Sequence, residues 1–365
     1  MADAEGLGGD AVARLRLIRT PRIGPVTYAH LLARFGSPEA AILALPQLAA
    51  RGGGIPPAVA APAVAERELA SVRRLGARHF FKGDPTYPPL LAQLDDAPPA
   101  LILRGDATLL SRTPIAMVGA RNASAAACRF ARQLAVELGR EQVVVVSGLA
   151  RGVDTAAHVG AIETGTIAVI AGGIDISYPP ENAELQERIA REGLLIAEQP
   201  PGTEPRARHF PYRNRIIAGL ALGTVVVEAA PKSGSLITAR LAAELGREVM
   251  AVPGSPLDPR AQGCNGLIRD GATLIQSAAD VLETIRPIDS RMVESPRSGF
   301  RTATPEDASD SDRRAIVDLL GPVPVAIDEL IRQSQASPAI VQTVLLELEL
   351  AGRLERHAGG RVALS

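Results

Sequence analysis

Apolar residues in the first fifth of the chain recur every three or four positions, as on one face of an amphipathic helix. Residues 11–78 carry this pattern, with proline and glycine between the helical stretches, and predict a helical domain over 1–78. Within it, PRIGPVTYAHLLARFGS (21–37) has the turn-then-helix form of a helix-hairpin-helix element. Two interpretations stay open: a hairpin whose backbone amides hold a DNA phosphate, and a small helical packing domain.

From about residue 79 the pattern changes to short runs of β-branched residues that alternate with helical segments. Each run is continuously apolar and is followed by a turn rich in glycine or serine. The runs lie at 115–119, 143–148, 166–173, 194–198, 224–229 and 248–254. Strands that are apolar on both faces and joined by helices predict an α/β fold, a Rossmann-like doubly wound, mainly parallel sheet over 79–287. In such sheets ligands bind at the carboxyl ends of the strands.

The last part of the chain shows a third pattern. Residues 288–311 are polar, with proline and serine, and are predicted to form a flexible linker. Residues 312–365 contain three helical patterns and then a short hairpin, which together predict a winged helix. Its third helical segment is acidic and apolar where a reader of the major groove should be basic. We therefore expect an accessory module that engages duplex DNA or a partner.

Charge and aromatic content restrict the function. The chain has 39 Lys and Arg against 40 Asp and Glu, a net charge of -1, so a site for a polyanion has to be local. Aromatic residues make up 3% of the chain and tryptophan is absent. This composition argues against a base-stacking platform and leaves most of the binding to phosphate contacts.

The cysteines and histidines indicate neither a metal site nor disulfides. Cys128 and Cys264 are far apart and the five histidines are scattered, so we expect no metal, no other cofactor and a reducing compartment. The N-terminus has no apolar signal-peptide segment, and the longest apolar run, 216–227, is shorter than the roughly 18 residues of a membrane span. We expect a cytoplasmic protein without membrane contact.

Polar and basic residues follow the predicted strands. Arg213 and Arg215 lie near the start of an apolar helix, where the helix dipole disfavours cations unless an anion joins them. We predict a crevice in which five cations, glycine amides and helix N-termini hold phosphates. The five cations are Arg121, Arg151, Arg213, Arg215 and Lys232. The other candidate binding residues are Gly119, Ser124, Ser147, Gly148, Gly173, Asn214, Ser233, Gly234 and Ser235.

The same turns offer no clear catalytic group, so we expect no enzymatic activity. PKSGS (231–235) lacks the register of a P-loop, and GARNAS (119–124) is not G-x-G-x-x-G. Asp154 and His158 are spaced like an acid–base pair, but capping of a helix start explains Asp154 more simply. Glu228 precedes its turn and is better placed to orient backbone or an arginine than to act as a base.

Six segments resemble, in the same order, the signature blocks of the bacterial DprA/Smf family of DNA-processing proteins. They are GARNAS, SGLARGVDTAAH, GGIDISYPPEN, FPYRNRIIAGL, SGSLITA and AVPGSP with GCNGLIRDGA. The resemblance covers about residues 80–285, and both terminal modules resemble extensions seen in that family. Ala120, Ala171 and Ala221 depart from the usual residues without removing a cation.

The resemblance implies a non-enzymatic protein that binds single-stranded DNA, protects it and loads the recombinase RecA onto it, chiefly during natural transformation. It also implies a homodimer built through the Rossmann-like domain. The alternative is a nucleoside-monophosphate phosphoribohydrolase of the related lysine-decarboxylase-like fold. Those hydrolases carry PGGxGT followed by a catalytic glutamate, whereas the equivalent stretch here, 231–240, ends in Ala239 and Arg240 without a carboxylate.

Overall fold

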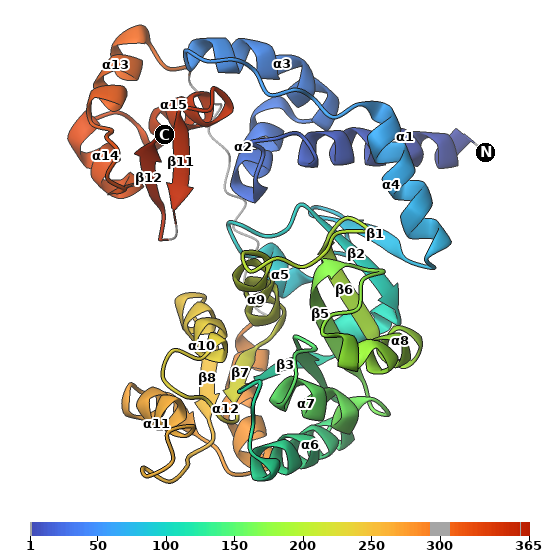
Figure 1. Ribbon diagram of the computed structural model, residues 1–365. Coiled ribbons are helices and arrows are strands. Elements are labelled where there is room, and N and C mark those ends of the chain that lie inside the picture. The colour runs from blue at the N-terminus through green and yellow to red at the C-terminus, as the bar shows by residue number, and fades with distance from the viewer. Residues whose placement is uncertain (1, 293–306, 358) are drawn as a thin grey trace. The chain divides into compact units, whose positions relative to one another are not determined.

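The protein is described by a computed structural model that covers residues 2–292, 307–357 and 359–365 (Figure 1). It divides into two compact units, one formed by Met1–Arg67 with Ser298–Ser365 and the other by Glu68–Arg297. The sequence suggested four segments, with boundaries after residues 78, 287 and 311. The structure instead joins the first and last segments in one unit, and each unit has its own hydrophobic cores.

A nine-stranded sheet forms the centre of the larger unit, in the order β1-β2-β6-β5-β4-β3-β7-β8-β9. The strands are β1 (Arg78–Phe81), β2 (Ala100–Gly105), β3 (Thr113–Val118), β4 (Val143–Ser147), β5 (Thr166–Gly173), β6 (Leu194–Gln199), β7 (Gly223–Val226), β8 (Glu248–Ala251) and β9 (Thr273–Leu274). The seven strands from β6 to β9 in this order pair in parallel, and β2 and β1 extend the sheet in antiparallel pairs. The predicted doubly wound sheet is confirmed, although the apolar runs did not indicate β1, β2 and β9.

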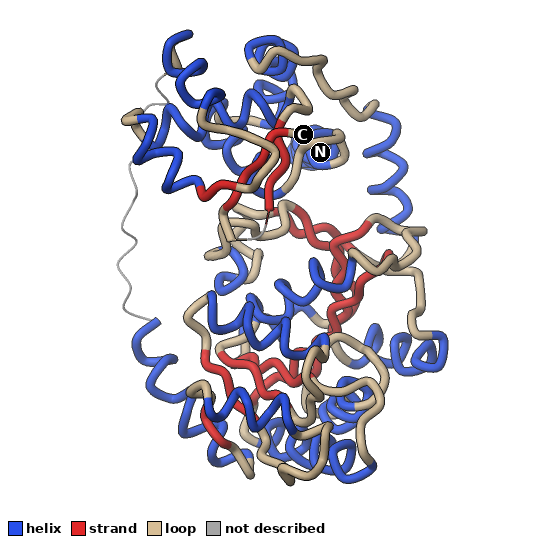
Figure 2. The backbone as a smooth tube through the Cα atoms, turned by 60° about the vertical axis from the view of Figure 1, so that its left-hand side comes forward, coloured by secondary structure: helices blue, strands red, loops and turns tan. Residues whose placement is uncertain are grey.

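Helices pack on both faces of this sheet (Figure 2). They are α4 (Pro62–Arg74), which contains the boundary between the units, α5 (Pro89–Ala92), α6 (Ala125–Arg140), α7 (Val153–Ala161), α8 (Ala183–Glu192), α9 (His209–Leu220), α10 (Gly234–Glu244), α11 (Gln262–Arg269), α12 (Ala278–Met292) and the short 3₁₀ helices η1 (Ala107–Ser111) and η2 (Pro180–Asn182). Successive residues of a strand point to opposite faces. Ile115 and Met117 of β3 therefore pack in the core with α6, while Ala116 and Val118 pack in the core with α9.

The smaller unit contains both ends of the chain. Its N-terminal helices are α1 (Ala2–Ile18), α2 (Pro25–Phe35) and α3 (Pro38–Arg51). Its C-terminal elements are α13 (Asp310–Asp318), β10 (Val325–Ala326), α14 (Ile327–Ser334), α15 (Pro338–Leu350), β11 (Leu354–His357) and β12 (Arg361–Leu364). β10, β12 and β11 form an antiparallel sheet. The predicted helical domain and winged helix are both confirmed, with β10 as an additional strand.

The linker predicted over 288–311 is described in part. Helix α12 continues to Met292, and α13 begins at Asp310. Residues 288–292 and 310–311 of the predicted linker are therefore helical, residues 307–309 are not, and residues 293–306 lie outside the described residues. Among the helices that the structure describes, each is too short or too polar to span a lipid bilayer.

The close approach of α7 to α6 depends on Gly160. A β-carbon at Gly160 would overlap the carbonyl oxygen of Arg132 and lie 2.9 Å from the β-carbon of Ala135. We predict that Gly160→Ala lowers the free energy of unfolding by about 1–3 kcal/mol in chemical denaturation, because the methyl group overpacks this contact. The matched control is Gly266→Ala in α11, where no described atom lies within 4 Å of an added β-carbon.

The control should leave unfolding unchanged or stabilise the protein by up to about 1 kcal/mol, since alanine favours a helix over glycine. Equal stability of the two variants would contradict the proposed role of Gly160.

Candidate functional site

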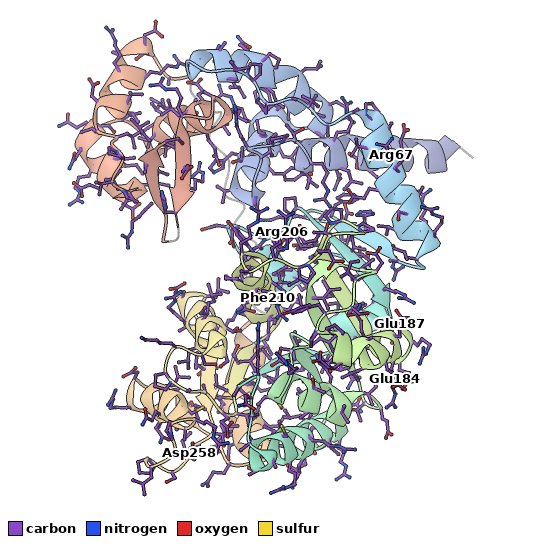
Figure 3. The ribbon with its side chains drawn as sticks, in the orientation of Figure 1. Arg67, Glu184, Glu187, Arg206, Phe210 and Asp258 are labelled. Carbon is purple, nitrogen blue, oxygen red and sulfur yellow. The ribbon has the colours of Figure 1, made fainter. Side chains whose placement is uncertain are left out.

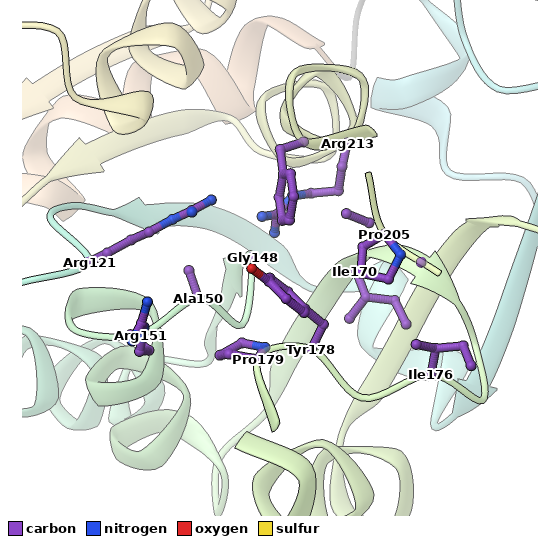
Figure 4. Close-up of a pocket in the computed structure, with 13 residues that line it drawn as sticks. Arg121, Gly148, Ala150, Arg151, Ile170, Ile176, Tyr178, Pro179, Pro205 and Arg213 are labelled. Carbon is purple, nitrogen blue, oxygen red and sulfur yellow. The ribbon is translucent and has the colours of Figure 1, made fainter. Parts of the chain in front are cut away.

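A pocket lies at the carboxyl ends of β3, β4 and β5 in the larger unit (Figure 4). It is a shallow pocket that opens to solvent, and both charged and apolar side chains line it. The turns after the three strands form most of its lining, and Pro205, Phe210 and Arg213 contribute from the start of α9. The predicted location at the carboxyl edge of the sheet therefore coincides with the pocket.

Two exposed arginines supply charge to this pocket. The guanidinium of Arg121 lies over the ring of Phe210, 5.0 Å from its centroid, within the range of a cation–π contact. Arg151 lies 3.7 Å from the carboxylate of Glu181, and both side chains are about 60% exposed. An exposed pair of this kind contributes little. Both arginines can therefore reach a ligand in the pocket.

Arg213 also lines the pocket, but its side chain is buried, with a relative exposure of 6%. Its Nη1 donates a hydrogen bond to the carbonyl oxygen of Val169, at 2.7 Å. Burial lowers the pKa of Arg213 to about 10, and the nearby charge of Asp154 opposes this shift. The guanidinium therefore stays charged at neutral pH, and its environment is already partly anionic.

Asp154 supplies that negative charge from inside the protein. Its Oδ2 accepts hydrogen bonds from the backbone amides of Gly148, at 3.2 Å, and Ala150, at 3.3 Å. Burial raises the pKa of the Asp154 carboxyl, while Arg213 and the two amides act in the opposite direction. Asp154 was expected to cap a helix start. In the structure it lies in the first turn of α7, and its carboxylate holds the turn after β4 that forms one wall of the pocket.

Arg215 does not reach the pocket, contrary to the prediction of one crevice with five cations. Its Nη2 donates to Oε1 of Glu198 at 2.6 Å, and its Nη1 donates to the carbonyl oxygen of Asp96 at 2.8 Å. Its side chain is 7% exposed. The anion expected at this helix start is therefore a carboxylate of the same chain.

The predicted residues after β7 lie outside the pocket lining. Lys232 is exposed in the turn, and the Ser233 hydroxyl caps α10 by accepting from the amide of Ser235. Gly234 begins α10, and Ser235 is buried with its hydroxyl 2.8 Å from that of Ser233. Asn214 is half-buried on α9 and is also absent from the lining. The residues that line the pocket thus include Arg121, Arg151 and Arg213 and none of this group.

Ser124 and Glu228 form a structural contact beside the pocket. Glu228 accepts a hydrogen bond from the Ser124 amide, at 2.9 Å, and another from its hydroxyl, at 2.7 Å. The Ser124 hydroxyl also caps α6 by accepting from the amide of Ala127. The interpretation that Glu228 orients backbone is confirmed. The phosphate contact predicted for the Ser124 hydroxyl does not fit this geometry, because the hydroxyl is occupied.

Three further candidates are internal. The Ser147 hydroxyl is fully buried and donates to the carbonyl oxygen of Met117, so it cannot contact a phosphate as predicted. The amide of Gly173 donates to the carbonyl oxygen of Thr203, and the neighbouring Gly172 lines the pocket in its place. A β-carbon at Gly119 would lie 2.5 Å from a methyl group of Val153. The absence of a side chain at Gly119 therefore leaves room for Val153.

The pocket also has an aromatic wall, which was not predicted from the sequence. Tyr178 is 45% exposed, and its ring centroid lies 5.6 Å from that of Phe210. Figure 3 shows Phe210 and the exposed Arg206 at the same end of α9. Ile170, Ile176, Pro179 and Pro205 complete the apolar lining. The signal was present in the sequence, since Tyr178 and Phe210 each belong to a segment that resembles a signature block of the family.

The groups considered for catalysis point inward. His158 is fully buried, and its Nδ1 lies 2.7 Å from the Thr166 hydroxyl. Burial, helped by the charge of Arg213, lowers the pKa of His158 to about 3. Among the described residues, no three His, Cys, Asp or Glu side chains are grouped so that they could hold a metal ion. Asp154 and His158 are therefore parts of the core beneath the pocket.

Three family models match separate parts of the chain. The model described as DNA recombination-mediator protein A matches residues 78–286. A DprA-like N-terminal HHH domain matches residues 9–71, and a DprA winged helix domain matches residues 300–360. The first model covers more than half of the chain.

Relatives and solved structures agree with these matches. DNA processing protein DprA of Streptococcus pneumoniae is 46% identical over 201 residues, which is 54% of this chain and 71% of that protein. Protein Smf of Escherichia coli is 37% identical over 284 residues, 76% of this chain and 75% of that protein.

The crystal structure of the Streptococcus pneumoniae protein is similar with a TM-score of 0.59 and 38% identity, over 68% of this chain and 83% of that chain. DNA processing protein A from Helicobacter pylori, in a structure that concerns its single-stranded DNA binding mode, gives a TM-score of 0.52 and 28% identity. That match covers 58% of this chain and 96% of that chain.

The buried His158 predicts a specific acid sensitivity. In the unfolded chain His158 takes up a proton near pH 6.5, but in the folded chain only near pH 3. Between these values the unfolded state binds the extra proton, so falling pH destabilises the fold by about 1.4 kcal/mol per pH unit. We expect His158→Gln to remove that contribution from the slope of unfolding free energy between about pH 5.5 and 4.5.

The matched control is His357→Gln, a change at an exposed histidine. It should keep the full slope. A slope in His158→Gln equal to that of the unchanged protein would contradict the neutral, buried state of this imidazole.

Proposed function

Because this chain belongs to the DNA recombination-mediator protein A family, we propose that it binds single-stranded DNA in the pocket at the carboxyl ends of β3, β4 and β5. The observation that carries the proposal is the combination of two exposed arginines, Arg121 and Arg151, with the buried charge of Arg213 around one cavity. Phosphates fit such a cluster because charge-assisted hydrogen bonds to arginine are strong and bidentate.

The chemistry of the wall extends this proposal from phosphates to bases. Tyr178 and Phe210 offer ring faces, and Ile170, Ile176, Pro179 and Pro205 offer apolar contact. A base that stacks on an aromatic side chain contributes about 1–3 kcal/mol to binding, whichever of the four bases it is. We propose that one nucleobase enters the pocket while Arg121 and Arg151 hold the phosphates beside it. Duplex DNA keeps its bases stacked and paired, so this mode favours a single strand.

The finer parts of the function rest on family membership. We propose that the bound strand is protected and transferred to RecA during recombination, including natural transformation, and that the protein acts as a cytoplasmic homodimer. We also propose that it binds DNA without chemical turnover. This last proposal is supported by the inward orientation of Asp154 and His158 and by the engagement of Glu228 with Ser124.

Removal of either exposed cation should weaken DNA binding and its salt dependence together. We predict that Arg121→Ala and Arg151→Ala each lower affinity for a single-stranded oligonucleotide by about tenfold, because each loses a charge-assisted contact. The log–log slope of affinity against salt should flatten by about 0.7 for each lost phosphate contact. Fluorescence anisotropy titrations at several salt concentrations measure both quantities.

Arg269→Ala is the matched control, since Arg269 lies in α11 with its side chain 84% exposed and outside the pocket lining. Its affinity and slope should match those of the unchanged protein. Unchanged affinity in both pocket variants, with normal melting temperatures, would refute the pocket as the DNA site.

Loss of the aromatic wall should lower DNA affinity without changing its salt dependence. We expect Tyr178→Ala to lower affinity by about 5- to 100-fold, the equivalent of one lost stacking contact, while the salt slope stays unchanged. An oligonucleotide with abasic sites should abolish the difference between the two proteins. Tyr212→Ala is the control, because Tyr212 is 58% exposed on the neighbouring helix α9 and does not line the pocket. A reduced slope in Tyr178→Ala would contradict base stacking.

A further inference from the structure

The third helix of the winged helix, α15, contributes buried side chains to two hydrophobic cores. Eight of its 13 residues are buried. Val341, Val344, Leu345 and Leu348 pack in the core of the winged helix itself. Leu346 and Leu350 belong to a second core, whose other members come from the N-terminal helices of the same unit. α15 therefore has two packing partners.

The second contact is close at the level of the backbone. α15 packs on α3, and the chain leaves α3 through three consecutive glycines, 52–54. A β-carbon at Gly52 would overlap the carbonyl oxygen of Glu347, and one at Gly54 would overlap that of Ala351. Gly52 has φ -72°, a value that alanine adopts equally well. The glycine at this position is thus required by the approach of α15 and not by its own conformation.

Hydrogen bonds from arginines cross the same contact in both directions. Nη1 of Arg22 donates to the carbonyl oxygen of Leu350, at 3.0 Å, and Nη1 of Arg34 donates to the hydroxyl of Thr343, at 3.2 Å. In the opposite direction, Nη1 of Arg353 donates to the carbonyl oxygen of Gly52, at 3.1 Å. These bonds join α15 and the residues just after it to the N-terminal helices.

Charge complementarity adds to these bonds. Arg51, at the end of α3, donates to Asp307 at 2.8 Å. Glu347 of α15 is buried, accepts two bonds from Arg313 at 2.8 and 2.9 Å, and lies 3.9 Å from Arg51. A buried carboxylate requires such partners, because one left without them would cost several kcal/mol.

We propose that α15 is a docking helix whose partner is the chain's own N-terminal helical domain, so that the two ends of the chain act as one module. In a DNA-reading winged helix, the helix at this position enters the major groove. Here its apolar side chains are packed on both sides, and its glutamates Glu347 and Glu349 are paired with Arg313 and Arg356. The helix therefore packs against protein on these faces and does not present them to a DNA groove.

Two alanine variants of the full chain test this docking. Gly52→Ala and Gly54→Ala place a methyl group against the backbone at α15 and its end, at φ values that alanine can adopt. Gly24→Ala is the control in open space within the same domain. Hydrogen exchange followed by mass spectrometry reports on α3, on α15 and, as a reference, on α6. We expect amides of α3 and α15 to exchange at least tenfold faster in the first two variants and in their combination. Gly24→Ala and the α6 reference should match the unchanged protein.

Unchanged exchange of α3 and α15 in the double variant would overturn the proposal. The same samples are titrated with a duplex oligonucleotide, which is the other ligand that α15 could serve. We expect unchanged duplex affinity in all variants. A tenfold rise in the double variant would also overturn the proposal, since it would identify α15 as a reader of duplex DNA that the N-terminal domain covers.

Discussion

The buried Asp154 carboxylate is the group on which the candidate site depends. It binds the amides of Gly148 and Ala150 and faces the charge of Arg213, so one side chain shapes a turn and balances a buried cation. A charge of either sign left alone in this position would cost several kcal/mol. Gly148 completes the arrangement, because a β-carbon there would occupy the space of the Arg213 guanidinium. The wall of the pocket is thus held in place by contacts within the protein.

Acidic residues hold the neighbouring elements in the same way. Glu228 fixes the turn after β3 through Ser124, and Glu198 holds Arg215 of α9. These carboxylates are used inside the protein, whereas Arg121 and Arg151 extend to the surface. A chain with a net charge of -1 can therefore present a local positive pocket. The net charge of the chain argues against a large basic surface, but it does not show where a small one lies.

The sequence predicts the parts of this structure that depend on local pattern. The central strands are buried on both faces and therefore appear as continuous apolar runs, whereas the two-residue β9 and the antiparallel β1 and β2 do not. Arg215 shows the limit at the site: its position after Pro211 suggests an anion, but the sequence does not show that Glu198 comes within 2.6 Å. The docking of α15 on α3 joins residues about 300 positions apart, such as Arg353 and Gly52, and has no local signal.

The low aromatic content argues against a base-stacking barrel, and it leaves room for two rings in one pocket. A base-stacking barrel needs several ring faces along a groove, and this chain has ten Phe and Tyr residues in total. A single pocket needs far fewer, and Tyr178 from the turn after β5 meets Phe210 from the start of α9 there. A hydrolase pocket would also need an acid or base directed at the ligand. Cations and rings line this pocket, while Asp154 and His158 are buried beneath it and form hydrogen bonds within the protein, so neither of these two groups is directed at a ligand.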